Sequence, residues 1–299
     1  MSNLAIYQRA EQARNAILDL FKSQNLGAAY DREIRYRLEG QFPHDVTGKA
    51  IRQLQASGQI MKTGLPGRRG AADLPIQFYK LPESNYDQLI PLIRRKLELS
   101  TFITGVANEM GRHAESAWWR AFKRSNWDLH PKSEKIPLGV REYRGRITST
   151  DHNIDFIAEK DGIEYGVEVK NGLNYPDDLY WKFSVAVDLG TIPLIIARWL
   201  NPGQVPTIPT LGGTEPILYK DAIYSTTYNP MITDIRKVLG APIEGRDEVD
   251  DEYFIRKINA THTATRADIE AKRKQLRDFA LDGRLNPKIR RILGDKRTR

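Results

Sequence analysis

Residues 153–171 read NIDFIAEKDGIEYGVEVKN, and the interpretation of the whole chain starts from this stretch. Apolar residues alternate largely with polar ones over 153–158 and again over 163–170, which is the period-two pattern of half-buried strands. Between these segments lies Asp161-Gly162, a dipeptide that accepts the positive φ angles of a two-residue hairpin turn. The stretch therefore predicts an antiparallel hairpin.

The turn also predicts the register of the two strands. If Lys160 pairs with Ile163, Asp155 lies directly opposite Glu168, and Cβ atoms of such partners are roughly 4.5–5.5 Å apart. Lys170 follows on the same face as Glu168. Like charges directly opposed destabilise a sheet unless something offsets them, and carboxylate oxygens are the ligands that Mg²⁺ prefers. The pattern predicts a Mg²⁺ site, in which Mn²⁺ is expected to substitute.

A resemblance rests on these residues. Asp155, twelve intervening residues and then Glu168-Val169-Lys170 resemble the catalytic signature of the PD-(D/E)XK nuclease superfamily. That superfamily includes restriction endonucleases, Holliday-junction resolvases and transposon-end nucleases. Its members usually carry an acidic residue on a helix before the core sheet, and Glu115 in GRHAESAWWRAFKRSNWDL stands in the matching place. Ile154 replaces the name-giving proline. The resemblance covers about residues 105–200.

The resemblance implies a fold and a reaction. The fold is an α/β restriction-endonuclease-like core, with a mixed central sheet flanked by helices. The reaction is metal-dependent hydrolysis of DNA phosphodiester bonds. Mg²⁺ would be held by Asp155, Glu168, the Val169 carbonyl and Glu115, while Lys170 orients or deprotonates the attacking water. Because both strands of double-stranded DNA must be cut, a homodimer is expected.

Several alternatives remain open. The preferred function is that of a sequence-directed type II restriction-type enzyme. A junction resolvase and a transposon-end nuclease of the same superfamily are the nearest alternatives. An RNA or tRNA nuclease and a non-enzymatic DNA-binding regulator are further alternatives. In the simplest alternative the hairpin is exposed, and Glu168 and Lys170 form a surface pair worth about 0–1 kcal/mol.

Composition narrows the possible partners and compartments. The 299 residues carry a net charge of +8, which favours a polyanionic partner. The chain has no cysteine, which excludes disulfides, thiolate catalysis and cysteine-bound zinc. The first fifteen residues lack the apolar run of a signal peptide. The longest apolar run, 192–200, is too short to span a bilayer, so a cytoplasmic protein without membrane contact is expected.

The N-terminal residues 1–82 are predicted to form a separate domain of helices and strands. Helical spacing predicts helices over 10–23, over 31–38 with Asp31 as N-cap, and over 47–58 with Thr47 as cap. Strands at 59–64 and 76–81 flank a loop rich in Gly, Pro and Arg. Three helices followed by a two-stranded wing resemble a winged helix-turn-helix domain that binds DNA. DNA contacts are expected on the third helix and at the loop, from Lys49, Arg52, Gln53, Gln55, Arg68 and Arg69. Protein contacts are the alternative use of such a domain.

The remaining chain divides into three predicted parts. Residues 83–104 form a connector helix, 105–246 the nuclease core, and 247–299 a basic helical extension. Within the core we expect a first strand over 137–147, a helix from Pro176 to Gly190, a buried strand over 192–200, a loop over 201–216 and one or two more strands on the sheet after it. Arg144 and Lys182 are expected to contact DNA. A last helix is expected to start near Thr265 and run to Leu281.

Overall fold

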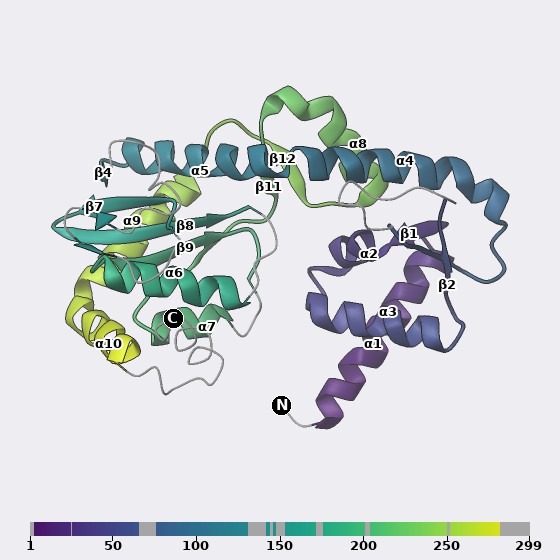
Figure 1. The fold of residues 1–299 in the computed structure, drawn as a ribbon, viewed down its shortest axis with the longest axis horizontal. Coiled ribbons are helices and arrows are strands. Elements are labelled where there is room, and N and C mark those ends of the chain that lie inside the picture. The colour runs from purple at the N-terminus through teal and green to yellow at the C-terminus, as the bar shows by residue number, and fades with distance from the viewer. Residues whose placement is uncertain are drawn as a thin grey trace. The chain divides into compact units, whose positions relative to one another are not determined.

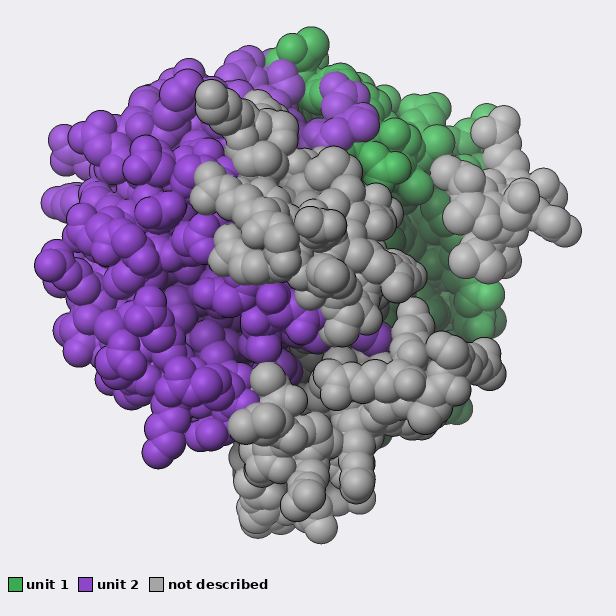
Figure 2. All heavy atoms as spheres, turned by 60° about the vertical axis from the view of Figure 1, so that its left-hand side comes forward, with its two compact units in different colours: residues 1–108, 227–243 green, residues 109–226, 244–299 purple. Residues whose placement is uncertain are grey.

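The computed structural model describes residues 3–24, 26–65, 76–130, 142–143, 146–147, 153–171, 176–200, 204–249 and 252–281 (Figure 1). The chain forms two compact units, coloured separately in Figure 2: residues 1–108 with 227–243, and residues 109–226 with 244–299. This division differs from the predicted domains. The expected connector helix belongs to the first unit, a later segment of the chain returns to that unit, and the C-terminal helices belong to the second unit.

The first unit combines helices with a small antiparallel sheet. Its elements are α1 (Asn3–Lys22), β1 (Ala28–Tyr30), α2 (Asp31–Leu38), α3 (His44–Ala56), β2 (Met61–Thr63), β3 (Phe78–Lys80), α4 (Tyr86–Gly105), the one-turn helix η1 (Thr226–Tyr228) and α8 (Asn229–Leu239). The strands have the order β1-β3-β2. The three predicted helices and two predicted strands are present, and β1 is an additional strand. The core between α1, α2 and α3 includes Ile17, Ile34 and Leu54.

The starts or N-caps of all three predicted helices differ from the prediction, and α1 begins at Asn3 rather than at residue 10. α3 begins at His44 rather than at Thr47, and the buried Thr47 hydroxyl donates to the Pro43 carbonyl at 3.2 Å. α2 begins directly after β1, so Tyr30 occupies the N-cap and Asp31 is the first helical residue. In neither α2 nor α3 does the N-cap residue make a side-chain capping hydrogen bond.

A buried ionic cluster makes α4 part of the first unit. Lys96 of α4 is 1% exposed, and its Nζ donates to the Ala28 carbonyl at 2.5 Å and to Glu33 Oε1 at 2.8 Å. Arg37 contacts the same Glu33 oxygen at 3.3 Å and the Val238 carbonyl at 2.7 Å. Buried charges need such partners, so these bonds attach α4 and α8 to β1 and α2.

The second unit is built around a mixed five-stranded sheet. Its elements are α5 (Ala107–Arg124), β4 (Asp128–His130), β5 (Glu142–Tyr143), β6 (Arg146–Ile147), β7 (Phe156–Lys160), β8 (Ile163–Lys170), α6 (Pro176–Asp188), β9 (Ile192–Ala197), α7 (Gln204–Thr210), β10 (Ile217–Leu218), β11 (Ala222–Tyr224), β12 (Ile243–Gly245), α9 (Glu252–Ala267) and α10 (Ile269–Leu281). The strand order is β10-β9-β8-β7-β4. β9 is parallel to β8 and β10, and the other pairs are antiparallel. Helices flank the sheet (Figure 1), so the predicted mixed α/β architecture is confirmed.

The predicted hairpin and its turn are confirmed. Asp161 and Gly162 both have positive φ, 51° and 73°, as a two-residue turn of this kind requires. Lys160 pairs with Ile163, and the pairing runs in the predicted register as far as Phe156 and Val167. One further position along this register brings Asp155 next to Glu168.

The hairpin is buried on both faces, so the prediction of half-buried strands was wrong. Phe156 packs with Phe122 of α5 on one face, and Ile157 clusters with Val185 and Leu189 of α6 on the other. A Cβ at Gly166 would lie 2.7 Å from the Thr191 hydroxyl and 3.2 Å from the Ala186 Cβ, so glycine allows the neighbouring side chains to pack this closely against β8. β8 is the central strand, and packed helices cover both of its sides.

Several other predictions need correction. The described parts of 137–147 are β5 and β6, which pair with each other in a separate sheet, and the main sheet instead begins with β4. β11 likewise pairs with β12 outside the main sheet. Helix α7 forms where a loop was expected. Thr265 is buried inside α9, which the pattern did not predict, and the last helix starts at Ile269. Within the described residues, no helix is both long and apolar enough to cross a membrane.

Candidate active site at the end of the central hairpin

The candidate site lies at one end of the sheet, where the ends of β8 and β9 meet the start of β7. β8 ends in Glu168 and Lys170, and parallel β9 ends beside it, with Lys170 paired to Ala197. The antiparallel β7 begins at the same end of the sheet, directly after Asp155. Ligand and catalytic residues collect at the carboxyl ends of parallel strands because the backbone there is free to present side chains outward. The acidic residues are largely enclosed: Asp155 is 6% exposed and Glu168 is 2% exposed.

Asp155 is fixed by the neighbouring strand. Its backbone N–H donates to the Val167 carbonyl at 3.0 Å, and its Oδ2 accepts from the Val169 N–H at 2.7 Å. Burial raises the pKa of Asp155 well above its usual range, and the charges of Glu168 and Glu115 raise this pKa further, while Lys182 opposes them. A carboxyl group whose pKa is raised by burial and by neighbouring carboxylates is typical of functional sites.

Glu115 lies on helix α5, as predicted, within electrostatic reach of Asp155. The aromatic residues that follow it, Trp118 and Phe122, are fully buried in the core. This packing fixes the face that the helix turns toward the sheet. Within the described ranges, no three side chains of His, Cys, Asp or Glu lie in metal-binding reach of one another.

Glu168 is held by two lysines through a single oxygen. Its Oε1 lies 2.8 Å from Lys170 Nζ and 3.0 Å from Lys182 Nζ. Its Oε2 is buried and has no hydrogen-bond partner among the described residues. A buried carboxylate oxygen normally accepts a hydrogen bond or binds a cation. The oxygen-only donor set of Asp155 and Glu168, with this unpartnered atom, fits a hard divalent cation such as Mg²⁺.

Lys182 was predicted as a DNA contact, and the structure corrects that assignment. Its side chain is buried on the face of α6 that packs against the sheet, and its Nζ donates to the Asn153 carbonyl as well as to Glu168. The sequence contains a usable signal for this position, because Lys182 shares the i, i+3, i+4, i+7 stripe with the buried Val185, Ala186 and Leu189. A lysine on the apolar stripe of a helix points toward the sheet rather than toward solvent.

A second polar group that the sequence analysis missed fixes the backbone at Lys170. The Tyr219 hydroxyl lies 3.1 Å from both the Lys170 carbonyl and Asn171 Oδ1, so its single proton is donated to one of them or shared between them. The Asn171 amide pairs with both backbone groups of Ile223 at 2.7 Å, and the Arg198 N–H donates to the Lys170 carbonyl at 2.9 Å. Burial raises the pKa of Tyr219, so its hydroxyl remains a neutral donor.

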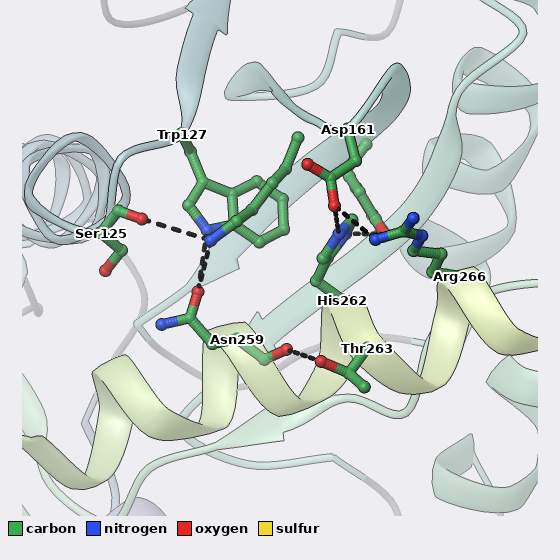
Figure 3. Close-up of polar contacts among 9 residues, drawn as sticks. Ser125, Trp127, Asp161, Asn259, His262, Thr263 and Arg266 are labelled. Atoms are coloured by element: carbon green, nitrogen blue, oxygen red, sulfur yellow. Dashed lines mark hydrogen bonds and ion pairs between the residues drawn. The ribbon is translucent and has the colours of Figure 1, made fainter.

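The turn of the hairpin is anchored to α9 (Figure 3). His262 Nε2 donates to Asp161 Oδ2 at 3.1 Å, and Arg266 contacts the same oxygen at 3.0 Å. The hydrogen bond from His262, assisted by the charge of Arg266, lowers the pKa of Asp161. The other ring nitrogen of His262 pairs with the Tyr165 hydroxyl at 2.9 Å. These contacts hold the hairpin against α9 without forming part of the candidate site.

The remaining predicted contacts with DNA lie elsewhere in the chain. On α3, Lys49 and Arg52 are exposed, whereas Gln53 and Gln55 are half-buried. Arg68, Arg69 and Arg144 lie outside the described residues. Val169 contacts Asp155 through its N–H, and its carbonyl remains a predicted metal ligand.

Comparisons of the chain with protein-family models, with curated proteins and with solved structures found no match.

Proposed function

We propose that this protein is a metal-dependent endonuclease that hydrolyses phosphodiester bonds of double-stranded DNA, in the manner of a sequence-directed type II restriction enzyme. The observation that supports this most strongly is the pair of buried carboxylates, Asp155 and Glu168, with an unpartnered Glu168 oxygen and two lysine ammonium groups beside it. Burying two neighbouring carboxylates costs free energy unless cations offset their charge, and a divalent cation bound to the unpartnered oxygen would do so.

Asp155 and Glu168 would hold the cation, with Glu115 approaching from α5. When bound, the cation supplies Lewis acidity, which polarises the phosphate and lowers the pKa of a bound water. Lys170 is the lysine suited to the reacting atoms, because its side chain is 23% exposed and can meet substrate. Its ammonium would orient the attacking water and stabilise the charge that develops on the phosphate oxygens.

DNA is the favoured substrate because of charge. The chain carries a net charge of +8, and the exposed Lys49 and Arg52 on α3 provide a surface that could contact phosphates and base edges. Binding by a separate unit would direct cleavage to particular sequences. A homodimer, which would cut both strands, and a winged-helix role for the first unit are parts of this proposal.

The test is a cleavage assay on long, unmethylated duplex DNA with Mg²⁺, repeated with EDTA. Discrete fragments that disappear with EDTA are the expected result. Cleavage of four-way junctions regardless of sequence would instead favour a resolvase. If linear duplex, branched DNA and RNA all stay intact, the endonuclease proposal is wrong and a DNA-binding regulator becomes the better interpretation.

The proposed DNA surface has its own test. Replacing Lys49 and Arg52 together with alanine should weaken DNA binding in EDTA and reduce the salt slope of log K by about 1.8, since each phosphate contact contributes about 0.9. Lys237→Ala, at an exposed position of α8, serves as the control for loss of a positive charge. An unchanged affinity and slope in the double variant would remove α3 as the binding surface.

A further inference from the structure

The two lysines on Glu168 differ in ways that suggest different tasks. Lys170 comes from the end of β8, and its side chain is 23% exposed. Lys182 comes from α6, and its side chain is 9% exposed. Both ammonium groups approach the same oxygen, Oε1, at 2.8 and 3.0 Å. One lysine can therefore reach substrate, and the other is enclosed.

Lys182 has a second partner that connects it to the other carboxylate. Its Nζ donates to the carbonyl of Asn153, two residues before Asp155. The same ammonium thus contacts Glu168 directly and the backbone segment that carries Asp155. Its position is set by α6, because Val185 and Leu189 on the same stripe pack against Ile154 and Ile157 of that segment and its strand.

We propose that Lys182 is the positioning residue of the metal site: it holds Glu168 by Oε1, so that Oε2 faces the cation, and it ties down the segment before Asp155. Lys170, the more exposed of the two lysines, then acts on the scissile phosphate and the attacking water. This inference rests on the proposed function, and it assigns to Lys182 a task within the site instead of contact with DNA.

The distinction follows from the number of donors and their enclosure. An ammonium group has three donors, and Lys182 directs two of them to Glu168 and Asn153. If Lys170 turns toward substrate, Glu168 keeps the bond from Lys182 and stays oriented. Residues that orient metal ligands typically contribute 10–100-fold to metal affinity or activity when mutated.

The experiment compares Lys182→Met, Lys182→Arg, Lys170→Met and the exposed control Lys274→Met in the full-length chain. Mn²⁺ binding is measured by calorimetry without DNA, and DNA binding is measured in EDTA. We expect Lys182→Met to bind Mn²⁺ about 10–100-fold more weakly and to bind DNA normally. Lys182→Arg should recover most of the affinity, because a guanidinium can donate to both partners. Lys170→Met should keep Mn²⁺ binding within about threefold of the parent chain, because Lys182 still holds Glu168.

The outcomes distinguish failure of the proposed function from failure of the positioning role of Lys182. If the parent chain binds no Mn²⁺, both the proposed function and this inference fail. If the parent chain binds Mn²⁺ and Lys182→Met binds it equally well, only the positioning role is wrong. Loss of DNA binding in Lys182→Met with unchanged Mn²⁺ affinity would restore the predicted DNA contact. Should Lys182→Met not fold by circular dichroism, Lys182→Gln replaces it with the same expected loss.

Discussion

Each unit of this protein buries a glutamate that is held by two cationic side chains, and only one of these clusters is a candidate active site. In the first unit, Glu33 is paired with Lys96 and Arg37. In the second, Glu168 is paired with Lys170 and Lys182. Both glutamates leave Oε2 without a hydrogen-bond partner among the described residues. A buried ion pair with one unpartnered oxygen is therefore not, by itself, a mark of function.

The difference lies in the neighbouring charges. Those that act on Glu33 come from Lys96 and Arg37, and both lower a pKa that burial raises. Near Glu168, the largest charge effects on Asp155 come from two other carboxylates, Glu168 and Glu115. The first cluster is a structural pair and its cations offset its charge, whereas the second gathers acidic groups that a divalent cation would offset. The comparison shows that clustered carboxylates, rather than burial alone, identify the candidate site.

The largest expected effect is on cleavage. Asp155→Ala and Lys170→Ala should each lower the single-turnover rate with Mg²⁺ by about 10²–10⁴-fold, because one removes a proposed metal ligand and the other removes the lysine proposed to act at the reacting atoms. DNA affinity in EDTA should not change. Glu33→Gln, in the other cluster, is the matched control and should leave the rate of the folded protein unaltered. Normal cleavage by both site variants would remove the functional distinction between the clusters.

The next effect is on stability and concerns the first unit. Lys96→Met should destabilise this unit by about 3–5 kcal/mol, because it leaves the Glu33 carboxylate buried without its closest partner. The double change Glu33→Met with Lys96→Met should recover most of that loss, since apolar side chains can replace a buried ion pair. Urea unfolding followed by circular dichroism measures both. A loss below about 1 kcal/mol in the single variant would show that the pair is not structural.

A third prediction separates the clusters by metal binding. At a Mg²⁺ concentration 100 times its Kd, the folded chain should gain about 2.7 kcal/mol, because the ion binds the folded state only. Glu168→Gln should abolish the resulting rise in Tm, and Glu33→Gln should retain it. Thermal unfolding with Mg²⁺ and with EDTA provides the measurement. A Mg²⁺-dependent rise in Glu168→Gln equal to that of the parent chain would place the cation elsewhere.

The smallest effect is expected at the other end of the hairpin. Asp161→Asn keeps a residue that accepts positive φ in the turn and removes the carboxylate that binds His262 and Arg266. Because the pKa of Asp161 is lowered in the folded state, its stabilisation is present above its unfolded pKa of about 3.9 and is lost as pH falls through the folded pKa.

The Asp161→Asn variant should therefore have a slightly lower Tm at pH 7, and the difference from the parent chain should disappear in acid. Thermal unfolding between pH 2 and 7 measures this, with the exposed Asp278→Asn on α10 as control. A difference that stays constant over the whole pH range would mean that the turn backbone, rather than the charge, causes it.

The predictions that were confirmed depend on local patterns. The Asp161-Gly162 turn sets the register within a few residues of itself, and helix α6 is bounded by Pro176 and by Gly190, whose φ is positive. The apolar run that forms β9 is buried at every position. Glu115 lies on a helix because the residues after it follow helical spacing. Each of these features is decided by side chains close together in the chain.

The features that the sequence did not reveal depend on contacts between residues far apart in the chain. The pattern around Ile157 does not reveal that α6 covers that face of the sheet. The expected connector helix joins the first unit through Lys96 and Glu33, which are 63 residues apart. Asn171 and Tyr219, which are 48 residues apart, meet only because β10 adds to the sheet edge. No local period can indicate such pairs, because they arise from how the elements pack.

The sequence by itself determined the hairpin, its register and the placement of Asp155 near Glu168 and Lys170, because backbone propensity and period-two alternation act over a few residues. Only the tertiary structure decided that both faces of this hairpin are buried and that Glu115 comes close to Asp155. It also decided that Lys182 points inward to share Glu168 with Lys170. These outcomes depend on the faces that α5 and α6 turn toward the sheet, and the packing of the whole second unit sets those faces.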